Sequence, residues 1–421
     1  MMMNFQNSIQ WSFLAVSLAA MVSGVHAVET VQTDSTDPSL PARELIQSGI
    51  VEEVTAEDYD YYGFTPEEKF PIRAKLRLEG YYDSNIFQAG SAETDDFVWE
   101  IQPDVYYELG SSGSTHNLVL GYNPNFILFT DNSSENAFNN GGYGRYTYTT
   151  DKTILGITHS SAEVDGANSD VGARVTRNEH ITRIFGNYKY SDKLTFEAEA
   201  GQSLRYYDLA TLSDYHDWYG EGFFLYEVTP KVQLGLGTKF GFVDIGLGPN
   251  QTYQQALVKV VYAASEKLQF TGSAGVEFRQ YQDPLGWEDR VTPAASLGLT
   301  WTPFDGTEYT LSVFRNVNPS ISIIGSNSVV TGFNSRIRQR LLNKFHYSLG
   351  GGFNYSDYRP TVVGAVNNRE DYYFNLRSAL EYQAFKYGSV SIYYEYQDNS
   401  TVNALSDFDR HLAGVQVMLE Y

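Results

Sequence analysis

Apolar and polar side chains alternate with a period of two through most of this chain. Between Phe97 and Leu109 every second residue is apolar, and Glu100, Asp104 and Glu108 occupy the opposite frame. Successive side chains of a β-strand point to opposite faces, so the pattern predicts strands whose two faces contact different media. Segments of this kind recur from residue 73 to residue 421, which predicts an all-β fold.

The last segment, residues 408–421, ends on an aromatic residue. Apolar side chains alternate at Val415, Val417 and Leu419, and the pattern continues to Tyr421. This ending is similar to the C-terminal signal by which the barrel-assembly machinery recognises outer-membrane β-barrels. The sequence therefore predicts that these four residues are the assembly signal of a barrel in the cell outer membrane of a Gram-negative-type bacterium.

The composition is compatible with a membrane-spanning barrel. No segment approaches the roughly 18 apolar residues that a membrane helix needs. The mean hydropathy of −0.34 suits strands that show lipid only alternate residues. The 33 tyrosines and 25 phenylalanines fit the two aromatic girdles of such a barrel. A net charge of −22 argues against a nucleic-acid partner, and the absence of cysteine excludes a disulfide framework.

The first 72 residues have a different character from the rest. Residues 1–27 combine an apolar core with a small-residue cleavage site at Ala27, which predicts a signal peptide, although Lys and Arg are missing from its start. Residues 28–72 are rich in Asp and Glu and predict an acidic, mostly disordered periplasmic segment. Residues 73–421 are predicted to form the barrel.

Short and long connections alternate along the predicted barrel. The short ones contain Asp, Asn, Ser or Pro and carry Lys152, Lys193, Lys231, Lys267 and Lys344. The long ones are polar and span residues 131–140, 165–172, 210–217, 244–251, 282–290 and 397–407. Short turns on one side and long loops on the other are typical of outer-membrane barrels and argue against a soluble propeller or β-solenoid.

The spacing of the segments predicts an antiparallel up-and-down β-barrel of about 18 strands, with a range of about 16–18. An even number places both ends of the barrel on the periplasmic side. Pro103 and Pro124 lie inside strand patterns, where each would forfeit a hydrogen bond of the ladder. We expect a bulge or a bend at both prolines.

Motifs in the first strands resemble those of a known family. Residues 82–87 (YDSNIF) are followed by 95–97 (DDF), 101–103 (IQP) and 120–122 (LGY). This stretch resembles the outer-membrane β-barrel porin family that is often encoded beside exopolysaccharide-export and exosortase gene clusters. The resemblance implies an outer-membrane barrel and a link to surface polysaccharide.

Charged residues on the frame opposite the apolar one are expected to face the lumen. The pore-lining candidates are Arg73, Lys75, Arg77, Glu100, Asp104, Glu108, Arg336, Arg338 and Arg340. We expect Arg77 to lie close to Glu108, whereas the three arginines at 336–340 have no obvious acidic ladder beside them. Two interpretations stay open, a constriction that selects solutes by sign and cross-strand ion pairs that stiffen the wall.

A further charged set combines Arg177 and Arg183 with Glu179 and Glu199. We expect these four side chains to lie near one another, with the same two interpretations.

No pattern in the sequence predicts an enzyme, a metal site or a cofactor. Asp214, His216 and Asp217 fall together in a predicted loop, but a rim histidine beside acids is usually a solvated residue. Zinc-ligand spacing and a phosphate-cradling glycine loop are both missing.

The function expected from these features is passive diffusion of small polar solutes through a porin-type channel, as a monomer or a homotrimer in outer-membrane lipid. We expect the connection at 316–329 to narrow the pore. The alternative is a specialised or plugged barrel for exopolysaccharide export or surface carbohydrate binding, in which Trp218, Trp287 and Tyr281 would stack on sugars.

Overall fold

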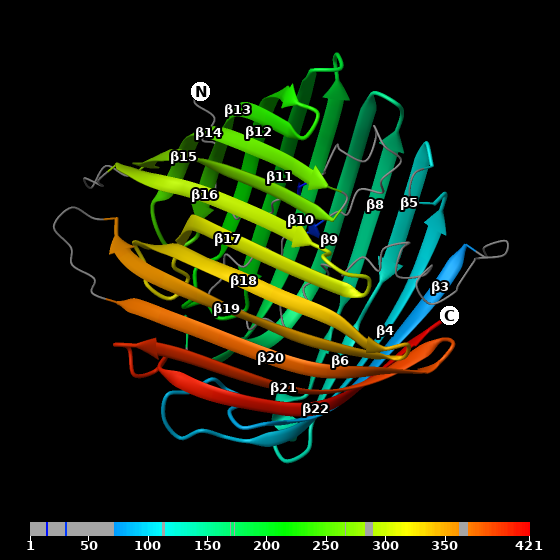
Figure 1. The fold of residues 1–421 in the computed structure, drawn as a ribbon. Coiled ribbons are helices and arrows are strands. Elements are labelled where there is room, and N and C mark those ends of the chain that lie inside the picture. Colours follow the sequence, from blue (N-terminus) through cyan, green and yellow to red (C-terminus); the bar gives the residue numbers. More distant parts are fainter. Residues whose placement is uncertain are drawn as a thin grey trace.

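The computed structural model is a closed antiparallel β-barrel, in which strands that follow one another in sequence lie side by side (Figure 1). The structure describes residues 71–111, 114–168, 170–171, 173–265, 267–282, 289–361 and 369–421, together with two short paired strands, β1 (Leu14–Ala15) and β2 (Thr30–Val31). The predicted signal peptide and acidic segment therefore lie almost wholly outside the described residues.

Consecutive strand segments make up the wall of the barrel. They are β3 (Ile72–Asp83), β4 (Asp96–Leu109), β5 (His116–Tyr122), β6 (Asn125–Phe129), β7 (Ala137–Asn139), β8 (Gly141–Thr149), β9 (Thr153–Asn168), β10 (Ala173–Lys189), β11 (Leu194–Tyr207), β12 (Tyr215–Thr229), β13 (Val232–Ile245), β14 (Asn250–Ser265), β15 (Leu268–Gln282), β16 (Arg290–Trp301), β17 (Thr307–Pro319), β18 (Ser326–Leu342), β19 (Phe345–Pro360), β20 (Glu370–Phe385), β21 (Gly388–Thr401) and β22 (Phe408–Glu420). A 3-10 turn, η1 (Ser133–Glu135), lies between β6 and β7.

Two of these strands are each interrupted once. β5 and β6 both pair with β4. On their other side, β5 pairs with β8 and β6 pairs with β7. Each of these two pairs of segments is therefore one strand, and the described wall has 18 strands. The predicted strand number and the antiparallel up-and-down arrangement are confirmed.

The interruption of β5 and β6 has a local cause in two prolines. Pairs on either side of the gap, Ile101 with Phe126 and Val105 with Tyr122, keep one register, which places Pro103 opposite Pro124. Thr130 donates its backbone N–H to Phe97, so this parity of residues is the hydrogen-bonded one. Neither proline has an N–H, and both bonds of that pair are missing. The expected bulge is wrong, because no extra residue is inserted, and the alternative of a bend stays a prediction.

The barrel closes where its last strand meets its first. β22 pairs antiparallel with β3 from Leu412 opposite Asp83 to Glu420 opposite Lys75. Tyr421 extends this seam, because its N–H donates to the Ala74 carbonyl at 2.8 Å and its carbonyl accepts from the Ala74 N–H at 3.1 Å. Figure 1 shows the C-terminus beside β3.

The two faces of the wall differ as the alternation predicts. Large apolar side chains on the outer frame are exposed, among them Trp99 at 53% and Leu236 at 67%. The inner frame carries buried polar and charged residues such as Glu79, Arg177 and Glu395. An apolar exterior around a polar interior is the arrangement of a barrel that sits in lipid. Within the described part of the chain, no helix has the length and apolar character to span a membrane.

Connections differ in length between the two ends of the barrel, which we term the turn end and the loop end. The turn end carries the start of β3, the end of β22 and the short lysine-bearing turns. Several connections at the loop end are shorter than expected, because Asp165 belongs to β9, Gln397 to β21 and Asp217 to β12. Cross-strand pairing continues through these polar residues, so the strands extend beyond the segments in which apolar residues alternate.

Candidate functional site: the barrel lumen

The charged residues that the sequence assigned to the lumen lie on the inner frame of their strands. They are Arg73, Lys75 and Arg77 on β3, Glu100, Asp104 and Glu108 on β4, and Arg336, Arg338 and Arg340 on β18. The residues that alternate with them on the outer frame, such as Val105 and Ile337, are exposed apolar side chains. That these charges line a path for solutes stays a prediction.

The ion pairs between β3 and β4 follow the register of the two strands. Arg73 lies 3.6 Å from Glu108, from Nε to Oε2, so the expected partner of Glu108, Arg77, is wrong. The register sets Arg77 opposite Gln102, six residues from Glu108, and its Nε lies 4.0 Å from Glu79. An arginine can reach only the two or three positions near its own cross-strand partner.

The acidic residues of β4 are also hydrogen-bonded. Tyr81 donates its hydroxyl to Glu100 at 2.8 Å, and Asn125 donates to the other carboxylate oxygen at 3.2 Å. Asp104 accepts from the hydroxyl of Tyr143 at 3.1 Å and lies opposite Lys75. These carboxylates are therefore held in place by neighbours on β3, β6 and β8.

Arg338 and Arg340 of β18 lie beside carboxylates that the local sequence does not reveal. Arg338 lies 3.3 Å from Glu381 of β20, and both side chains keep more than a quarter of their surface exposed (29% and 28%). Arg340 lies 2.5 Å from Asp305, in the turn between β16 and β17. Arg336 lies opposite Thr310 and Gly350 and is exposed. The wall at this height thus presents both signs of charge.

A second set of charged groups forms a buried network on β10 and β11. Glu179 lies 2.7 Å from Nε of Arg177 and 3.1 Å from Nε of Arg205, and all three side chains are buried. Arg183 lies 2.6 Å from Glu199. The sequence grouped four of these five residues. Arg205 was missed, because only the register of β10 and β11 brings it opposite Glu179.

Aromatic rings on the inner frame cover several of the lumen cations. The cationic groups lie 4.0–5.4 Å from ring centroids in the pairs Lys239–Tyr219, Arg377–Tyr393, Arg369–Tyr358, Arg279–Tyr253 and Arg205–Tyr215. A cation over a ring face is stabilised by the quadrupole of the ring. The alternation of apolar residues identifies the outer frame, and no sequence pattern distinguishes the tyrosines of the inner frame from the others.

The loop end of the lumen is narrowed by connections that fold inward. The connection at 320–325, between β17 and β18, meets Asp170, which follows β9. Ile321 is 6% exposed and packs in a buried apolar cluster with Leu212, Tyr215 and Val243. The N–H of Ser213 also donates to the Ile321 carbonyl at 3.1 Å. These contacts place the connection between β17 and β18 inside the loop end of the lumen, where it was expected to narrow the pore.

Arg369, just before β20, completes this contact. Its guanidinium lies 3.1 Å from Asp170 and 2.6 Å from Asp371. Burial lowers the pKa of Arg369, but its hydrogen bonds to Asp371 and the nearby charges raise the pKa above its ordinary value overall. Arg369 therefore stays charged beside the two carboxylates.

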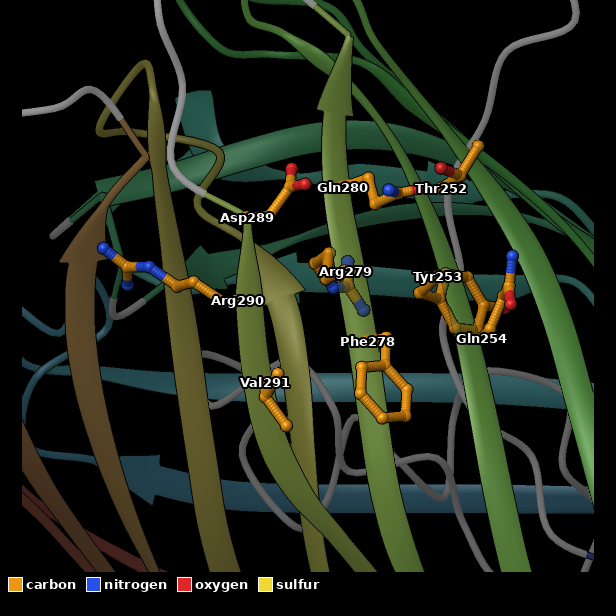
Figure 2. A pocket seen from close by; sticks show the side chains of 9 residues that line it. All are labelled: Thr252, Tyr253, Gln254, Phe278, Arg279, Gln280, Asp289, Arg290 and Val291. Atoms are coloured by element: carbon orange, nitrogen blue, oxygen red, sulfur yellow. The ribbon is translucent and has the colours of Figure 1, made fainter.

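A pocket of about 210 Å³ lies at the loop end of β14, β15 and β16 (Figure 2). Arg279 is part of its lining, but its guanidinium is already engaged by Glu277 at 2.7 Å, Gln251 at 2.8 Å and the carbonyl of Val317 at 3.1 Å. The arginine thus joins β15 to β14 and β17, which favours a structural role over an anion site.

Among the described residues, those that could have stacked on sugars or formed a catalytic cluster do not gather. Trp218 faces outward and donates to Gln202 at 3.1 Å, whereas Tyr281 accepts a hydrogen bond from Asn327. Trp287 lies outside the described residues. His216 also faces outward, 3.2 Å from Asp244, while the next residue, Asp217, is buried on the inner frame.

No protein-family model and no curated protein matches this chain. The resemblance to the porin family of exopolysaccharide clusters therefore stays a prediction beyond the barrel itself.

Several solved structures have a similar fold. The outer membrane protein OpdK of Pseudomonas aeruginosa shares 11% identity, with a TM-score of 0.44 over 83% of this chain and 99% of that one. OccK2 (OpdF) of the same organism, in complex with glucuronate, shares 12% identity, with a TM-score of 0.44 over 83% and 98%. OccK5 (OpdH) shares 10% identity, with a TM-score of 0.43 over 83% and 98%. Values this low assign neither a family nor a solute to the chain.

Proposed function

We propose that this chain is a porin-type channel of a Gram-negative outer membrane that lets small polar solutes diffuse passively. The observation that carries the proposal is a closed wall with an apolar exterior and charged side chains on its inner frame. A charge facing lipid at the membrane midplane costs about 2–4 kcal/mol, whereas one facing water costs little. The charges therefore favour a lumen that contains water.

The size of the barrel is consistent with a pore. Eighteen strands, roughly 4.8 Å apart and tilted by about 40°, form a ring with a diameter on the order of 35 Å. Side chains fill the interior of much smaller barrels, whereas barrels of 16–18 strands leave an aqueous channel. The inward connections at the loop end reduce this width, which favours small solutes over polymers.

Charge pairing along the wall bears on the kind of solute. Arg73, Arg338 and Arg340 each lie within 4.0 Å of a carboxylate, as do Lys75 and Arg377. Opposite charges at this distance largely cancel at the distance of a passing ion. We therefore propose that the lumen discriminates weakly by the sign of the solute.

The C-terminal strand supports a second part of the proposal, recognition by the barrel-assembly machinery. Val415, Leu419 and Tyr421 are exposed on the outer frame, alternating with inward residues, and Val417 shares that frame. The strand also closes the barrel against β3. The element read as a signal would thus be the element that completes the wall.

Single-channel recording of the refolded chain from residue 28 onward, in a planar bilayer, tests the channel. We expect discrete conductance steps with a reversal potential near zero in a salt gradient. If protein whose strand content shows that it is folded gives no conductance, the result would instead support the plugged barrel.

A further inference from the structure

We propose that Asp170 is a latch that holds the β17–β18 connection in the mouth of the barrel, and that solutes enter when this latch releases. The inference rests on the proposed channel, because only a channel needs a mouth that opens.

The carboxylate of Asp170 binds three consecutive residues of the connection. It accepts hydrogen bonds from the hydroxyl of Ser320 at 3.2 Å and from the N–H of Ile321 at 3.2 Å. Ser322 donates both its N–H at 3.2 Å and its hydroxyl at 2.9 Å. Hydrogen bonds to a charged group are stronger than those between neutral groups. One side chain therefore binds the polar groups of the connection, beside the packing of Ile321 and the hydrogen bond from Ser213.

The two sides of this contact come from distant parts of the ring. β9 and β17 are separated by the seven strands β10 to β16 on one side and by a longer path on the other. In a ring of 18 strands they are nearly opposite. The connections that follow β9 and β17 thus meet inside the mouth, where Asp170 also contacts Tyr358 of β19 and Arg369 before β20.

The near end of the connection is anchored differently. Gly325 has φ of 71°, a left-handed conformation that glycine adopts without strain. Its carbonyl accepts from both the N–H and the hydroxyl of Thr361, at 2.9 and 2.8 Å. Ser320 and Ser326 are joined across the base at 3.0 Å. Loss of the Asp170 contact would leave this base intact, so the connection can swing about it once the Ser213 hydrogen bond and the packing of Ile321 also give way.

The released carboxylate would not be left bare. Arg369 lies 3.1 Å from Asp170, and the hydroxyl of Tyr358 donates to it at 3.0 Å. Both residues are outside the moving connection, so they can keep the charge of Asp170 paired in an open state. The desolvation cost that usually opposes breaking a buried polar contact is thereby reduced.

A redox-controlled pair tests the latch directly, since the chain has no cysteine of its own. The variant Asp170→Cys with Ser322→Cys lacks the latch when reduced and has a covalent one when oxidised. We expect long, large openings in single-channel records under dithiothreitol and their suppression several-fold after oxidation. Each single cysteine variant is the control and should not respond to the redox state.

Asp170→Ala gives a second reading without a disulfide. We expect a larger open fraction than in the unaltered chain, and faster reaction of an Arg338→Cys lumen cysteine with a bulky maleimide added from outside intact cells. Currents that are the same in the unaltered, Ala and reduced or oxidised double variants would overturn the latch. The absence of both current and labelling in every variant would instead refute the channel.

Discussion

At the scale of single residues, the inner wall is a set of charge pairs whose value depends on burial. The pair of Arg338 and Glu381 is partly exposed and is weakened by water and salt, as surface pairs are. The network around Glu179 is buried, so loss of its one carboxylate would leave two guanidinium groups facing each other. The two kinds of pair should respond differently to the same change.

Glu179→Gln should destabilise the barrel strongly. The substitution keeps the shape of the side chain and removes the charge that Arg177 and Arg205 share, and breaking a buried pair costs about 3–5 kcal/mol. Urea unfolding in vesicles, followed by tryptophan fluorescence, measures the change. Asp305→Asn is the control, because Asp305 is mostly exposed and its loss should alter the midpoint little. Equal effects of the two substitutions would contradict this ranking.

Removal of Tyr421, or its replacement by Lys, should leave unassembled protein in the periplasm. The residue pairs with Ala74 at the closing seam and ends the outward apolar frame of β22. Heat-modifiable migration on gels distinguishes folded from unfolded barrels. Tyr421→Phe keeps the aromatic ring and should assemble normally. Normal assembly of Tyr421→Lys would refute the assembly-signal proposal.

The sequence contained enough information to assign residues to faces but not to pair them. Alternation alone put Arg73, Glu108 and Arg338 on the inner frame, since a strand has only two faces. The partner of Arg338 lies 43 residues away on β20, and the partner of Glu108 is Arg73 where the sequence pointed to Arg77. Pairing depends on register, and register depends on turn geometry that composition does not encode.

At the scale of elements, the strand segments were predicted well and their ends were not. Apolar alternation stops at the edge of the apolar band, whereas the ladder of hydrogen bonds continues into polar residues such as Asp165 and Gln397. The same limitation explains the expected bulges at Pro103 and Pro124. Each proline can be recognised in the sequence, but their position opposite one another cannot.

Pro124→Val should join β5 and β6 into one segment. The new N–H would point toward the carbonyl of Pro103, and one added backbone hydrogen bond contributes about 0.5–1.5 kcal/mol. Amide exchange at position 124 and the urea midpoint measure the gain. Pro103→Val is the reciprocal change and should act similarly. An unprotected amide at position 124 would show that the gap has another cause.

At the scale of the whole molecule, the lumen combines paired charges along the wall with a narrowed mouth. The ion pairs along the wall predict weak ion selectivity. The narrowed mouth predicts that the size of a solute, and not the sign of its charge, limits its passage. These are separate properties, because the β18 arginines lie toward the turn end and Asp170 lies at the loop end.

Glu381→Gln should shift the channel toward anions. Its carboxylate is the partner of Arg338, so its loss leaves a partly exposed positive charge on the inner frame. The reversal potential in a salt gradient reports the shift, which should fade at high salt as charges are screened. Glu370→Gln removes the same charge from the outer frame of the same strand and should leave the potential unchanged. A shift of equal size in both variants would contradict the face assignment.

The most direct test of the account is cysteine modification of β18 during single-channel recording. Arg338→Cys should react with a small water-soluble maleimide and change the current, because the account places this side chain in a water-filled lumen that conducts. Ile337→Cys, one residue away and facing lipid, should do neither. Labelling of Ile337→Cys in preference to Arg338→Cys, or labelling of Arg338→Cys with no change in current, would contradict the channel through the lumen.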